Sequence, residues 1–93
     1  MKPLDLLKLS GYRLRFRWLN KKTYGLIDFQ RETITINLEL FVTATAVHEL
    51  AHLEKPDLSE RKIIKLERAR VNRMTTKDIR TLARKLLKGG GYG

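Results

Sequence analysis

The sequence contains no cysteine and only two histidines, so few side chains are available to hold a metal ion. Disulfides and thiolate metal sites are excluded, and any metal must be bound by His, Asp or Glu. Long apolar runs are also missing, since the longest, residues 40–46, is too short and too rich in threonine to span a bilayer. The first five residues, MKPLD, place proline and aspartate where a signal peptide would become apolar. We therefore expect a soluble cytoplasmic protein without a transmembrane segment.

Acidic residues are scarce compared with basic ones, and the chain carries a formal charge of +10. Residues 1–30 contain seven basic and two acidic residues, and residues 31–60 contain two basic and six acidic ones. Residues 61–93 contain eleven basic and two acidic residues. This excess favours acidic partners, such as nucleic acid or an anionic membrane surface, although a solvated basic surface is the plainer interpretation. The 93 residues suffice for a single domain over residues 1–88, followed by a flexible glycine-rich tail at 89–93.

The hydrophobic pattern changes period near the middle of the chain. Apolar and polar residues alternate in three segments joined by short turns, which predicts an antiparallel meander. A short helix is expected before these strands, and three helices after them, with caps at Thr43 or Thr45, at Ser59 and at Thr76. The pattern predicts a small α+β domain. Its expected strands are residues 12–19, 23–29 and 33–38, and its expected helices are residues 3–9, 43–53, 60–74 and 77–88.

Both histidines belong to one five-residue run, His48-Glu49-Leu50-Ala51-His52. Residues four apart lie on the same face of a helix, so His48 and His52 can offer two imidazole nitrogens to one ion. Glu49 is one step round the helix, where it can act as general base toward a water on that ion. The competing interpretation is an ordinary amphipathic helix with two incidental histidines. The predicted helix and its apolar neighbours favour the metal site.

Two histidines leave a zinc site without its third protein ligand, and a carboxylate must supply it. Glu60 is the first residue of the next predicted helix. The competing interpretation is that its negative charge only interacts favourably with the positive end of the helix dipole. Glu67 is the alternative, on the inward stripe of the same helix, where it can also pair with a flanking arginine such as Arg70. Spacing alone leaves both open.

Residues 45–52, TAVHELAH, resemble the active-site helix of the smallest zincin metallopeptidases, and more loosely that of the minigluzincins. Trp18, Tyr24-Gly25, Ile34-Thr35-Ile36 and residues 56–60 (PDLSE) occur in the order seen in small uncharacterised phage, bacterial and archaeal proteins of this type, so the resemblance covers about residues 12–70. It implies a stripped zincin domain with one Zn²⁺ per chain, Glu60 as third ligand and hydrolysis of peptide or protein substrates. It also implies that strand 33–37 is an edge that pairs with the substrate backbone, and that C-terminal segments can hold the enzyme latent.

Two other functions remain open. In the first, the last two predicted helices form a helix-turn-helix-like module, in which a basic face contacts phosphates or an anionic membrane surface. In the second, the zincin fold holds a structural metal and performs no catalysis. The basic face comprises Lys77, Arg80, Arg84, Lys85 and Lys88.

Overall fold

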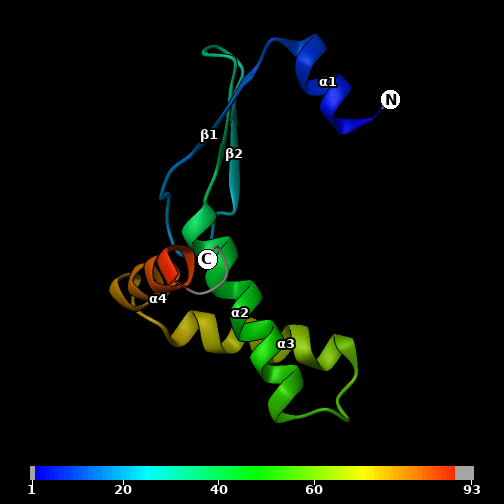
Figure 1. The fold of residues 1–93 in the computed structure, drawn as a ribbon, viewed down its shortest axis with the longest axis vertical. Helices are drawn as coiled ribbons and strands as arrows, with labels where there is room; N and C mark the ends of the chain where they lie inside the picture. The colour runs from blue at the N-terminus through cyan, green and yellow to red at the C-terminus, as the bar shows by residue number, and fades with distance from the viewer. Residues whose placement is uncertain (1, 90–93) are drawn as a thin grey trace.

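Residues 2–89, which the computed structural model describes, form a three-stranded sheet and four helices, which confirms the predicted α+β class (Figure 1). The expected tail at 89–93 lies outside these residues, except for Gly89 at the end of the last helix. The elements are α1 (Pro3–Ser10), β1 (Arg13–Phe16), β2 (Gly25–Asp28), β3 (Thr33–Ile36), α2 (Leu38–Glu54), α3 (Glu60–Arg73) and α4 (Thr76–Gly89).

The sheet is mixed, and the predicted antiparallel meander is wrong. The strand order is β1-β3-β2, so β3 is the middle strand. It pairs antiparallel with β2 and parallel with β1. The predicted role of strand 33–37 as a substrate-binding edge is therefore also wrong, because both of its edges are occupied.

Asn37, directly after β3, gives the physical reason for this topology. Its side-chain amide donates hydrogen bonds to the carbonyls of Asn20 and Thr23, and its backbone N–H donates to the carbonyl of Tyr24. The β1–β2 connection is thereby held across the end of β3. A fully buried asparagine thus joins three segments, which the alternation of apolar residues does not report.

Asn37 is also the N-cap of α2. The helix begins at Leu38, five residues before the predicted start at residue 43. Its side-chain oxygen accepts a hydrogen bond from the N–H of Leu40, as an N-cap does. Thr43, a predicted cap, lies inside the helix instead, where its hydroxyl donates to the carbonyl of Ile79 in α4. Ser59 caps α3 as predicted. Thr75, rather than Thr76, caps α4 by accepting from the N–H of Asp78.

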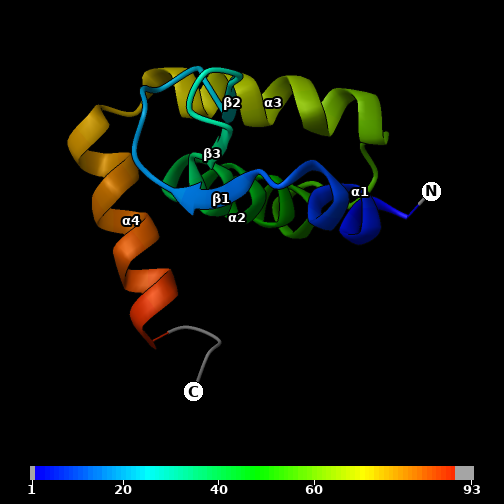
Figure 2. The same cartoon turned by 90° about the horizontal axis from the view of Figure 1, so that it is seen from above.

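The core lies where α3 and α4 pack on two sides of α2 (Figure 2). Small and branched side chains let the helices approach closely, and Trp18 and Met74 cover the cluster from the side. The buried members of this cluster are Leu40, Ala44, Val47, Val71 and Ile79. Because α2 is central to this packing, its position is fixed by both neighbouring helices.

The sheet and α1 contribute little to this core. Leu14 and Phe16 share one face of β1 but are 47% and 61% exposed, and Leu4 and Leu6 of α1 are exposed as well. In Figure 1, α1 lies at the far end of the sheet from α3 and α4. Among residues 2–89, no helix is long and apolar enough to cross a membrane.

We expect Asn37→Ala to lower the free energy of unfolding by about 2–3 kcal/mol, because it removes a helix cap and leaves buried backbone carbonyls unpaired. Chemical denaturation measures the change. Asn72→Ala, at an exposed position of α3, is the matched control and should change stability by under about 0.5 kcal/mol. Equal effects of the two substitutions would contradict this role of Asn37.

Candidate metal centre

The two histidines lie side by side on the flank of α2 that faces α3. Their rings are 4.9 Å apart between centroids, as the four-residue spacing predicts. The His48 side chain is 17% exposed and that of His52 is 33% exposed. On the adjoining face, Val47 and Ala51 are buried in contact with the other helices, which fixes the helix beneath the imidazoles. Leu50 and Leu53, two other apolar residues in and beside the run, are exposed.

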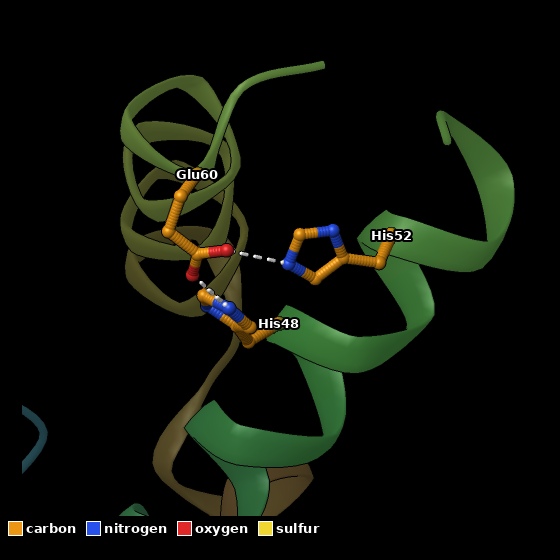
Figure 3. Close-up of side chains that lie close together, drawn as sticks. All are labelled: His48, His52 and Glu60. Atoms are coloured by element: carbon orange, nitrogen blue, oxygen red, sulfur yellow. Dashed lines mark hydrogen bonds and ion pairs between the residues drawn. The ribbon is translucent and has the colours of Figure 1, made fainter. Parts of the chain in front are cut away.

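A short connection brings Glu60 opposite these rings. The N–H of Lys55 bonds to the carbonyl of Ala51 and ends α2, and Ser59 caps α3 one residue before Glu60. The first residue of α3 thus points back toward α2 (Figure 3). One carboxylate oxygen of Glu60 lies 2.6 Å from Nε2 of His48, and the other lies 2.9 Å from Nε2 of His52.

The three residues can hold a metal ion. One ligand atom from each of His48, His52 and Glu60 lies within 4.8 Å of the others. Neighbouring ligands of a tetrahedral zinc ion are about 3.3 Å apart, as follows from metal–ligand distances near 2 Å. The observed contacts are somewhat shorter, and Glu60, with a 59% exposed side chain, has room to move. Two imidazoles and a carboxylate form a donor set that suits such an ion.

Glu67 lies against the other nitrogen of His48. Its carboxylate is 2.9 Å from Nδ1 of that ring, and its side chain is only 16% exposed. A carboxylate that accepts the Nδ1 proton leaves Nε2 free to bind a metal and fixes the plane of the ring. The two carboxylates that the sequence offered as alternatives therefore occupy different places, with Glu60 facing both Nε2 atoms and Glu67 facing Nδ1.

The electrostatics of the site favour positive charge between these residues. The hydrogen bond with Glu67 raises the pKa of His48, and the charges of Glu60 and Glu67 add to this effect against the opposing effect of burial. Both carboxylates thus stabilise the imidazolium form. A cation placed among the same oxygen and nitrogen atoms would be stabilised by the same charges.

Glu49 lies on the exposed side of α2, one step round the helix from His48. It makes no hydrogen bond or ion pair with any side chain in residues 2–89. In this it differs from Glu39 and Glu54 of the same helix, which pair with Arg80 and Arg70.

A groove of about 480 Å³ opens beside His48, between α2, α3 and the start of β2. Phe41 and Ile64 give it apolar walls, and Tyr24 and Arg68 line it as well. Burial and the charge of Glu67 raise the pKa of Tyr24, and the charge of Arg68 opposes them. Sequence reasoning missed this groove and Arg68, because its walls come from three segments with no common motif.

The predicted basic face of α4 is only partly available. Arg80 is turned inward, where it donates two hydrogen bonds to Glu39 and lies 5.5 Å from the ring centroid of Trp18. It therefore links α4 to the start of α2. The exposed members of that face are Lys77, Arg84, Lys85 and Lys88.

Comparison of the chain with protein-family models, with curated proteins and with solved structures gave no match. The assignment of a function depends on the residues and the geometry described above.

We expect Glu67→Gln to weaken Zn²⁺ binding by about 10- to 100-fold, because it removes the carboxylate that orients His48. Glu60→Ala should weaken binding further, since it removes a ligand rather than its support. Competition with a chromogenic chelator measures both affinities. Asp57→Ala, in the nearby exposed loop, is the control and should leave the affinity unchanged. A larger loss for Glu67→Gln than for Glu60→Ala would show that the two roles are reversed.

Proposed function

We propose that this protein is a zinc-dependent peptidase of minimal zincin type, with one Zn²⁺ held by His48, His52 and Glu60. The observation that carries the proposal is the approach of Nε2 of both histidines to a single carboxylate from the next helix. Three protein ligands leave a fourth position open, which is the arrangement of catalytic rather than structural zinc sites. Two histidines with a glutamate also form the ligand set of well-known zinc peptidases.

The residues around the ligands support catalysis rather than structure alone. Zinc bound at such a site supplies a Lewis acid and makes water more acidic. The carboxylate of Glu67 lies against Nδ1 of His48, where it would favour the tautomer that presents Nε2 to an ion. Glu49 is the general base in this proposal, because it follows His48 in the sequence and its carboxylate has no partner among the described side chains.

The groove beside His48 is the place for a substrate in this proposal. It adjoins the metal ligands, and its walls combine apolar groups with Tyr24 and Arg68. A peptide or protein segment bound there would place a carbonyl near the ion. Because β3 is the middle strand, a substrate strand would have to use another edge than the one predicted from the sequence. In this proposal the protein acts in the cytoplasm, as expected from the sequence.

We expect Glu49→Gln to keep zinc and to lower the rate of peptide cleavage by about 10²- to 10⁴-fold, because an amide cannot accept the proton. Cleavage of a quenched fluorescent casein and metal analysis of the same samples measure the two properties. Glu54→Gln removes a carboxylate from the same helix away from the site, and it should retain activity.

The proposal would be contradicted if the Glu49→Gln variant still cleaved the peptide and the unchanged protein still cleaved it in the presence of a metal chelator. Zinc binding without any cleavage by the unchanged protein would favour the structural-metal alternative instead.

A further inference from the structure

A row of cations follows one side of α3 next to the groove. Arg61, Lys65 and Arg68 are four and three residues apart, so they lie along one line of the helix. All three are exposed. Within residues 2–89, none of them forms an ion pair with an acidic side chain. The row is therefore a line of positive charge without a counter-charge from the described part of the chain.

The acidic residues of α3 lie away from this side of the helix, although Lys62 and Arg73 elsewhere on α3 likewise form no ion pair within residues 2–89. The two glutamates of α3, Glu60 and Glu67, both face the histidines of α2. Arg70, on another side of the same helix, pairs with Glu54. The helix thus directs its acids to the metal centre and leaves only cations along the row.

Arg68 connects the row to the groove. It lines the groove with Tyr24, Phe41 and Ile64, and the same groove reaches His48. Arg61 lies in the same helical turn as Glu60, and Lys65 lies between the two arginines along the row. Of the three cations only Arg68 lines the groove, which Glu67 lines as well, and Lys65 borders a different surface pocket with Lys62 and Leu66. A molecule that leaves the groove past Arg68 and follows α3 would meet the other two cations of the row.

We propose that an extended acidic peptide enters the groove at Arg68 and follows α3 outside it, so that its Asp or Glu side chains face Arg61, Lys65 and Arg68. By the rise of an α-helix, the row is about 10 Å long. Side chains on one face of an extended peptide recur about every 7 Å, so two acidic side chains fit along it. Charge complementarity selects this occupant over a neutral peptide. The inference rests on the proposed function, because it names the substrate class of the same site.

Binding of two fluorescent peptides tests the inference, one of alternating Glu and Leu and one in which Gln replaces every Glu. Anisotropy titrations on the zinc-loaded full chain, in the Glu49→Gln background, measure affinity without turnover. The acidic peptide should bind more tightly, and added salt should weaken its binding. Arg68→Gln should reduce the preference for the acidic peptide by about three- to fivefold, as expected for a partly exposed ion pair.

Lys62→Gln is the matched control, because it removes one charge from the same helix at an exposed position outside the row. It should reduce the preference much less than Arg68→Gln does. Equal binding of the two peptides, or equal losses in the two variants, would overturn the inference.

The inference and the proposed function can fail separately. A preference for the acidic peptide that depends on Arg68, in a protein that cleaves nothing, would support the groove and contradict the peptidase. Cleavage that depends on zinc but shows no preference for acidic peptides would support the peptidase and contradict the inference.

Discussion

The packing of α3 against α2 is the constraint on which the rest of the site depends. The connection between the two helices is short, and Ser59 caps α3 so that Glu60, its first residue, lies 2.6 Å from Nε2 of His48. Buried Ile63 and Val71 hold the remainder of α3 in place. Two turns further along, the same helix places Glu67 against Nδ1 of His48. One helix pair therefore supplies both histidines, the carboxylate that faces them and the carboxylate that orients one of them.

The distribution of charge follows from the same arrangement. Three of the six acidic side chains of residues 31–60 are engaged, since Glu39 and Glu54 pair with arginines and Glu60 faces the histidines. Most cations of α3 and α4 are exposed, whereas Glu60 and Glu67 lie against the histidines, so a protein with a charge of +10 contains a cluster of residues that could hold a metal ion. The positive surface then favours anionic molecules around the site, and the carboxylates at its centre favour a metal ion.

The sequence predicted the helices better than it predicted the sheet, for identifiable reasons. The spacing of His48 and His52 and the cap at Ser59 are local signals, and the structure has both features as expected. Alternation indicates which strand residues share a face, but it reports neither strand order nor whether a face is covered. The topology depends on long-range hydrogen bonds of Asn37. The separate places of Glu60 and Glu67 depend on how the connection turns, and spacing alone allowed either to face the Nε2 atoms of the histidines.

The central claim is that His48, His52 and Glu60 form a zinc site, and the zinc content of the untagged protein tests it most directly. The protein should be purified without chelators and analysed by mass spectrometry of the metal. The account predicts about one zinc per chain, regained after chelation and lost in His52→Ala. A protein that carries no zinc and takes up none on titration, while remaining folded, would contradict the account.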